Sequence, residues 1–86
     1  MDNLYQEIKE IIAEELKIPA ARLADDLTIE DLGLDSLTLA EILIVLQQKL
    51  GKTIQASKLI QQSNRDTCLS SLINNIIQLV TAENGI

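Results

Sequence analysis

Aliphatic residues recur every three or four positions along three stretches of the chain, residues 3–17, 36–50 and 68–81. This spacing places them on one face of an α-helix, so each stretch is predicted to form an amphipathic helix. A shorter stretch, residues 58–62, predicts one additional short helix, which is the third in chain order. No stretch alternates with the two-residue period of a β-strand. The pattern therefore predicts an all-α fold, a four-helix bundle whose third helix is short.

Polar and helix-breaking residues mark the ends of these helices. The side-chain oxygens placed to accept a backbone N–H bond at the four helix starts belong to Asn3, Asp35, Ser57 and Thr67. Gln6 completes a capping-box pattern with Asn3. Pro19 is predicted to end the first helix and Gly51 the second, and residues 82–86 are expected to be a frayed tail.

Residues 18–35 form a long connection between the first two helices. A structureless loop of this length is unusual in so small a domain, so we expect it to pack across the helices, with a single turn around Glu30–Leu32. The aliphatic residues available for this packing are Ile18, Leu23, Leu27, Ile29, Leu32 and Leu34. Its carboxylates Asp25, Asp26 and Asp31 are expected to be solvated rather than engaged in specific contacts.

The predicted helix over residues 36–50 carries more aliphatic residues than one core-facing stripe requires. Leu37, Ile44 and Val45 extend its apolar surface beyond that stripe. We expect Val45 to be buried. Leu37 and Ile44 are expected to be partly exposed, as an apolar patch of the kind that marks a binding surface.

The length and charge of the chain narrow its class of function. Its 86 residues predict a single domain with one modest core. The chain has 13 Asp and Glu against 7 Lys and Arg, so it lacks the basic surface that nucleic-acid binding requires. Partners with basic surfaces are the better expectation.

The sequence also lacks residues that most catalytic and metal sites need. With no His and a single Cys, Cys68, the chain cannot assemble a Ser-His or Cys-His nucleophile, a zinc site or a disulfide. We therefore expect no enzymatic activity from the chain alone, and we interpret Cys68 as a packing residue with no thiolate-stabilising cluster nearby. The longest aliphatic run, residues 42–46, is too short to span a bilayer, and the N-terminus lacks the basic region of a secretion signal. The expectation is a cytoplasmic monomer.

Ser36 is the first residue of the second predicted helix, directly after a loop that contains Gly33. A helix N-terminus has backbone N–H groups without intrahelical partners and carries partial positive charge, so it stabilises a phosphate attached there. Ser36 is therefore a candidate anchor for a phosphorylated group. Taken alone, a serine at this position is more often an ordinary capping residue.

The segment Asp31-Leu32-Gly33-Leu34-Asp35-Ser36-Leu37, followed by Glu41 and an aliphatic helix, resembles the phosphopantetheine attachment motif of acyl carrier proteins. The resemblance covers essentially the whole chain. It implies the four-helix bundle of that family and a non-catalytic carrier. It further implies that a phosphopantetheinyl transferase attaches 4′-phosphopantetheine to Ser36, where acyl groups are then held as thioesters.

The resemblance also assigns roles to residues around Ser36. Gly33, Asp35 and Leu37 would accompany Ser36 at the cofactor site, and the surface read by partner enzymes would comprise Leu37, Ala40, Glu41, Ile44 and Gln48. The expected partners are the transferase, acyl-loading enzymes, ketosynthases and enzymes that modify or transfer acyl groups. Gly33 has two open interpretations: it leaves room for a partner, or it only ends a turn. Asp35 is expected to cap the helix and to help orient a metal ion or a basic residue of the transferase.

Departures from the family pattern bear on the pathway. Carriers of fatty acid synthesis commonly have acidic second and third helices, whereas residues 47–49 and 58–62 here carry Gln and Lys, and only Glu41 is negative within the second helix. Lost carboxylates weaken steering towards a basic partner. We therefore favour a bacterial polyketide or mixed polyketide-peptide pathway, with a fatty acid carrier or a peptidyl carrier as alternatives.

Three further points stay open at the level of sequence. A different class of function, an unmodified helical interaction module, would use the apolar face of the second helix with Ser36 only as a cap. The ends of the sequence suggest a free-standing carrier, although a domain excised from a synthase would look similar. A core of Leu, Ile and Val, with Tyr5 as the single aromatic residue, can repack around a guest, which raises the hypothesis that an aliphatic acyl chain is sequestered between the second and third helices.

Overall fold

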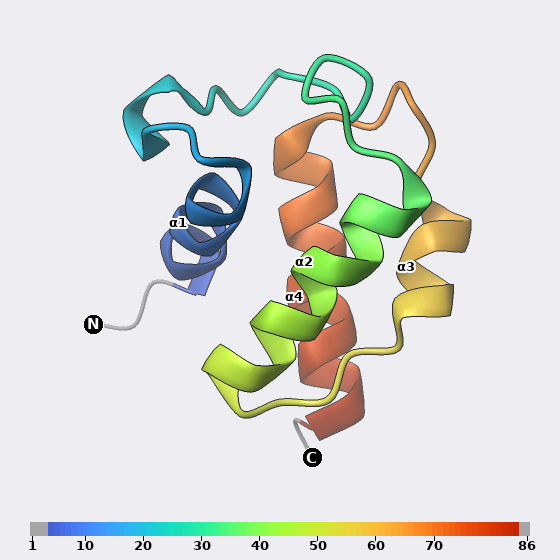
Figure 1. The fold of residues 1–86 in the computed structure, drawn as a ribbon. Helices are drawn as coiled ribbons and strands as arrows, with labels where there is room; N and C mark the ends of the chain where they lie inside the picture. The colour runs from blue at the N-terminus through green and yellow to red at the C-terminus, as the bar shows by residue number, and fades with distance from the viewer. Residues whose placement is uncertain (1–3, 85–86) are drawn as a thin grey trace.

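Four α-helices make up most of the described part of this computed structural model, residues 4–84 (Figure 1). The helices are α1 Leu4–Leu16, α2 Ser36–Leu50, α3 Ala56–Gln62 and α4 Leu69–Asn84, and a short 3-10 helix, η1, covers Ala20–Arg22. Residues 4–84 contain no β-strand, only an isolated antiparallel bridge between Thr28 and Cys68. The all-α fold predicted from the sequence is confirmed.

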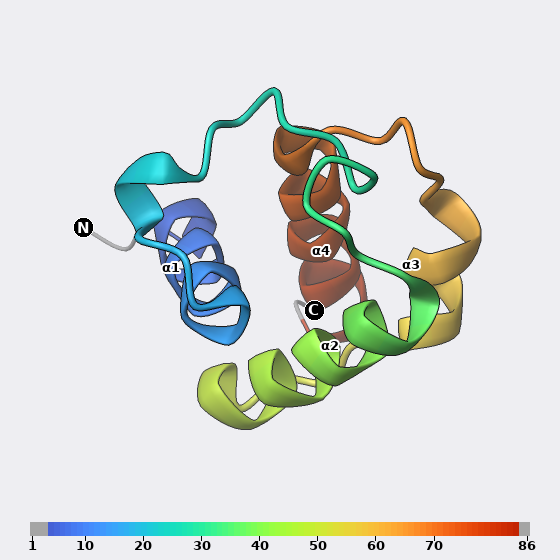
Figure 2. The same cartoon turned by 45° about the horizontal axis from the view of Figure 1, so that its top comes forward.

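The helices close around one core, each packing against two others. α1 packs against α2 and α4, and α3 packs against the same two helices from the other side. α2 runs across the molecule, beginning beside α3 and ending beside α1 (Figure 2). At that end Lys49 Nζ lies 2.7 Å from Glu14 Oε1. The start of α2 is therefore the end that faces α3.

The core is entirely aliphatic. No polar or charged residue is buried within the part of the chain that the structure describes. The side chains that are fully buried are Ile8, Ile12, Leu23, Ile42, Leu43, Leu46, Leu59, Leu69, Leu72, Ile73 and Ile76. The loop before α2 contributes Leu23, Ile29 and Leu34, so it packs across the helices as expected. Among the described helices, none is long and apolar enough to cross a membrane.

Two of the predicted helix caps are wrong. α3 begins at Ala56, so Ser57 lies inside the helix, and its N-cap is Gln55, whose carbonyl accepts the Lys58 and Leu59 N–H groups. α4 begins at Leu69 rather than directly after Thr67. The Thr67 hydroxyl instead accepts the N–H of Asn64 at 2.9 Å, so it stabilises the preceding turn.

The C-terminal ends of the first and last helices also differ from the ends predicted from the sequence. α1 ends one residue earlier than expected, with Lys17 in the left-handed region at φ +59°. α4 continues to Asn84, so the frayed tail predicted from residue 82 is wrong over residues 82–84. The predicted cap at Asn3 lies outside the described residues.

A single helical turn before α2 is capped at both ends. At its start Thr28 Oγ1 accepts the Asp31 N–H at 3.0 Å, and Asp31 Oδ2 accepts the Thr28 N–H at 3.1 Å, which is a capping box. At its end the Leu34 N–H donates to the Ile29 carbonyl at 3.0 Å, and Gly33, with φ +69°, occupies the left-handed position of a Schellman motif. We refer to residues 28–34 as the capped turn. Asp31 is therefore a structural residue, and the expectation that it is merely solvated is wrong.

Backbone hydrogen bonds join this part of the loop to the connection between α3 and α4. The Ile29 N–H donates to the Thr67 carbonyl at 2.9 Å, and the Leu69 N–H donates to the Leu27 carbonyl at 2.7 Å. The Glu30 N–H reaches the Arg65 carbonyl at 3.1 Å. The loop passes over the start of α4 (Figure 1), so these bonds fix the capped turn against α4.

Asp25 ties the same loop to α1. Its Oδ1 accepts the Tyr5 hydroxyl at 2.7 Å and lies 3.3 Å from Lys9 Nζ. These two donors hold the pKa of Asp25 below its usual value. Burial and the bond to Asp25 raise the pKa of Tyr5 to about 12. The expectation that Asp25 makes no specific contact is therefore also wrong.

The capping box makes a testable contribution to stability. Thr28→Ala removes the oxygen that accepts the Asp31 N–H, so it is expected to lower the free energy of unfolding by about 1 kcal/mol, measured by urea denaturation. Thr28→Ser keeps that oxygen and serves as the matched control, with stability close to that of the parent chain. Equal losses in the Ala and Ser variants would show that the methyl group, and not the cap, matters.

Candidate functional site

Ser36 is exposed at the first position of α2, directly after the N-cap residue Asp35. Asp35 Oδ1 accepts the Thr38 N–H at 2.7 Å, and the Asp35 carbonyl accepts the Leu39 N–H at 2.9 Å. The bond from the Thr38 N–H lowers the pKa of the Asp35 carboxyl, so this carboxylate stays ionised at neutral pH. Because Asp35 supplies the cap, the Ser36 hydroxyl is not needed for that role.

Gly33 is required by the backbone three residues before Ser36. Its φ of +69° is a conformation that residues with a Cβ adopt only at a cost. A Cβ added there would meet nothing within 4 Å, so the space beside Gly33 is open. Both sequence-based interpretations of Gly33 are thus consistent with its surroundings: it ends the capped turn, and it leaves the approach to Ser36 clear.

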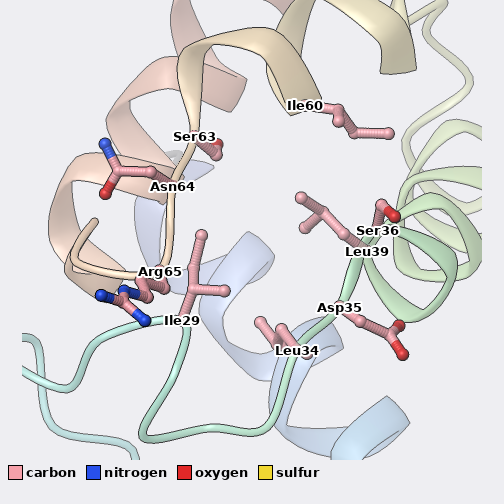
Figure 3. Close-up of a pocket in the computed structure, with 9 residues that line it drawn as sticks. All are labelled: Ile29, Leu34, Asp35, Ser36, Leu39, Ile60, Ser63, Asn64 and Arg65. Carbon is pink, nitrogen blue, oxygen red and sulfur yellow. The ribbon is translucent and has the colours of Figure 1, made fainter.

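A cavity of ≈ 170 Å³ adjoins Ser36 between the start of α2 and the end of α3. Ile29, Leu34, Leu39 and Ile60 project into it and form its apolar wall (Figure 3). Asp35 and Ser36 lie at its edge with their side-chain oxygens turned outwards. The arrangement places an exposed hydroxyl beside a small apolar chamber.

Part of the cavity wall comes from residues that sequence reasoning did not single out. Four of the nine lining residues come from α3 and the connection to α4: Ile60, Ser63, Asn64 and Arg65. No local motif marks these positions. They reach the site because the capped turn is bonded to the same connection, through contacts such as Glu30 N–H to the Arg65 carbonyl.

The outer face of α2 carries the residues expected to contact partners. Leu37 and Ile44 are the exposed large hydrophobic residues of the described chain, at 70% and 54% exposure. Glu41 and Gln48 are exposed beside them, and Ala40 is half-buried. Leu37, Glu41, Ile44 and Gln48 follow one another at helical spacing, so they form one strip. Val45 is expected from the sequence to be buried, and this prediction is wrong because the residue is only half-buried.

Cys68 differs from its sequence-based interpretation. It directly precedes α4, and its carbonyl accepts the Leu72 N–H at 2.9 Å. Its Sγ lies 3.3 Å from Ser70 Oγ and 3.4 Å from Ser71 Oγ. These bonds lower the pKa of the Cys68 thiol to about 7, so thiolate-stabilising groups are present after all. Within residues 4–84, no cluster of His, Cys, Asp and Glu could hold a metal ion.

Comparison with known proteins bears directly on this site. A family model described as a phosphopantetheine attachment site matches residues 6–65, which include Ser36. An acyl carrier protein of Campylobacter hominis is 34% identical over 77 residues, covering 85% of this chain and 98% of that protein. An acyl carrier protein of Saccharopolyspora erythraea is 35% identical over 58 residues, covering 66% of this chain and 61% of that protein.

The cap beside Ser36 predicts a pH dependence of stability. The folded-state pKa of Asp35 is lowered, so its contribution is present above the unfolded pKa and is lost as pH falls through the folded value. Asp35→Ala is expected to lower the urea midpoint at pH 7 and to have a smaller effect near pH 3. Asp35→Asn keeps an acceptor oxygen and is the matched control, expected to lie near the parent at pH 7. An Ala effect that is equal at both pH values would contradict the assigned role of the carboxylate.

Proposed function

The chain belongs to the acyl carrier protein family, whose members are non-catalytic carriers with a covalent phosphopantetheine group, and we propose that Ser36 is its attachment residue. The observation that carries this proposal is the exposed Ser36 hydroxyl at the first position of α2, beside an apolar cavity. The N-terminus of α2 favours a phosphodiester there, because its N–H groups and partial positive charge face the attached phosphate.

The base that activates Ser36 comes from a second protein, because this chain has no His and the adjacent Asp35 carboxylate, bonded to the Thr38 N–H with a lowered pKa, is a weak base. The Ser36 oxygen forms the new bond to phosphorus, the bond between the two phosphates of coenzyme A breaks, and the adenosine bisphosphate leaves. The hydroxyl proton passes to the base of the phosphopantetheinyl transferase. Asp35, ionised next to Ser36, is placed to orient a metal ion or a basic side chain of that enzyme. When bound, the group supplies a terminal thiol that holds acyl chains as thioesters.

The attachment site is tested by intact mass spectrometry. Incubation with coenzyme A and a promiscuous phosphopantetheinyl transferase is expected to add the mass of one phosphopantetheine group. Ser36→Ala is expected to gain none, whereas Ser57→Ala, a change at another exposed serine, retains the full gain. The absence of a mass gain in the parent chain, or a gain that persists in Ser36→Ala, would refute the proposal and favour an unmodified interaction module.

We propose that partner enzymes dock on the strip of α2 formed by Leu37, Glu41, Ile44 and Gln48, with Ala40 beside it. Its two exposed aliphatic side chains are those that a partner would desolvate, which makes them the strongest candidates for binding energy. The strip begins directly after Ser36. A partner seated on it would therefore hold the attached group next to its own active site.

The charge around this strip supports a specialised pathway. Residues 42–65 contain four cations and no carboxylate, and these cations are Lys49, Lys52, Lys58 and Arg65. Long-range attraction from a basic partner is therefore weak over this half of α2 and α3. We favour a bacterial polyketide or mixed polyketide-peptide pathway on this ground, over the alternatives of fatty acid synthesis or a peptidyl carrier.

The cavity beside Ser36 supports sequestration of an aliphatic acyl group between α2 and α3. Its apolar wall is continuous with the aliphatic core through Leu34 and Leu39. An apolar chain removed from water there gains roughly 25 cal/mol for each Å² buried. Sequestration would shield the carried group from water while the carrier moves from one enzyme to the next.

The docking strip is tested by single substitutions. Leu37→Ala and Ile44→Ala are each expected to raise the KM of the transferase for the carrier, and the Kd for a cognate ketosynthase, by about tenfold. Both side chains are exposed, so thermal unfolding is expected to stay unchanged. Gln78→Ala on exposed α4 surface is the control. Parent-like values for both aliphatic variants would place the docking surface elsewhere.

A further inference from the structure

We propose that Ser63 selects for carried acyl groups that bear an oxygen, a hydroxyl or a keto group, within the cavity beside Ser36. The Ser63 hydroxyl would exchange a hydrogen bond with that oxygen. This inference rests on the proposed attachment at Ser36, and it names the class of cargo that the same site favours.

The Ser63 hydroxyl is the one buried side-chain polar atom in the described chain that has no hydrogen-bond partner. Leaving such a group unpaired in an apolar setting is costly, so native structures retain it rarely. An alanine at this position would fill nearly the same space without that cost. The presence of an unpaired hydroxyl is explained if a bound ligand supplies its hydrogen-bond partner.

The side chain of Ser63 lies on the cavity side of the connection, whereas the side chains of the next two lining residues turn away (Figure 3). Ser63 follows the last residue of α3, and its extended conformation, with φ −102° and ψ 147°, takes it out of the helix. Asn64 Oδ1 accepts the Asp66 N–H at 2.8 Å, and Thr67 Oγ1 accepts the Asn64 N–H, so these polar groups satisfy one another. Ser63 takes no part in that network. Figure 3 shows it on the cavity side of the connection, whereas Asn64 and Arg65 turn away.

The dimensions of the cavity limit the cargo. Its volume is ≈ 170 Å³, close to that of an apolar cavity that holds benzene, so about six non-hydrogen atoms fit. Ile29, Leu34, Leu39 and Ile60 demand that most of these atoms be carbon. One unpaired hydroxyl, Ser63 Oγ, lies against this wall with less than 1 Å² of accessible surface. A short acyl chain with an oxygen that displaces the side chains covering Ser63 is therefore the best match.

The test compares matched cargoes on matched proteins. The parent chain, Ser63→Ala and the control Ser57→Ala are loaded on Ser36 by the transferase with coenzyme A, hexanoyl-coenzyme A or β-hydroxyhexanoyl-coenzyme A. Intact mass first establishes loading, so a failure of the proposed function is seen separately. Thermal unfolding and amide chemical shifts are then measured for each loaded form.

The expected result is a coupling between Ser63 and the cargo hydroxyl. In the parent chain and in Ser57→Ala, β-hydroxyhexanoyl raises the unfolding temperature more than hexanoyl and shifts the Ser63 amide resonance. In Ser63→Ala the two cargoes give equal temperatures, and the unloaded variant unfolds above the unloaded parent because a buried unpaired hydroxyl is gone. Equal effects of both cargoes on the loaded parent chain would overturn the proposal. Shifts of the Ser63 resonance that are already complete with the unacylated arm would also overturn it, because they would assign the hydroxyl to the arm itself.

Discussion

The pairing between the capped turn and the connection that leads into α4 is the constraint on which the site depends. Residues 28–34 close on themselves through a capping box and a Schellman motif, so their backbone groups need few partners from the helices. The Ile29 and Glu30 N–H groups donate to the Thr67 and Arg65 carbonyls. Just before the turn, the Leu27 carbonyl accepts the Leu69 N–H, and together these bonds fix where the chain enters α2. The position of Ser36 and one wall of the cavity follow from this docking.

The division between what the sequence predicts and what it does not has a physical cause. Helical periodicity depends on residues three or four apart, so it predicts α2 and the buried face of α4 well. The Asp35 cap is likewise a contact over three residues. Ser63 and Arg65 enter the site through contacts with residues more than twenty positions away, for which no local pattern exists.

The error at the start of α4 has the same origin. Ser57 and Thr67 are good capping residues by type, yet the residue before the first turn is Gln55 in α3 and Cys68 in α4. Thr67 is occupied by the turn at Asn64, and its carbonyl is bonded to Ile29. Tertiary contacts therefore override local preference where the connection is held from both sides. Asp25, which a charge count treats as solvated, is bonded for the same reason, to Tyr5 twenty residues away. Asp31 is bonded locally, in the capping box with Thr28.

The bridge between Thr28 and Cys68 also has a consequence for biosynthesis on the ribosome. It joins positions separated by nearly half of the chain, so the turn that precedes Ser36 cannot dock until α3 has been made and α4 has begun. A nascent or truncated chain would expose the serine without its supporting walls. Ser36 therefore reaches its place beside the cavity only in a chain whose last helix has begun to form.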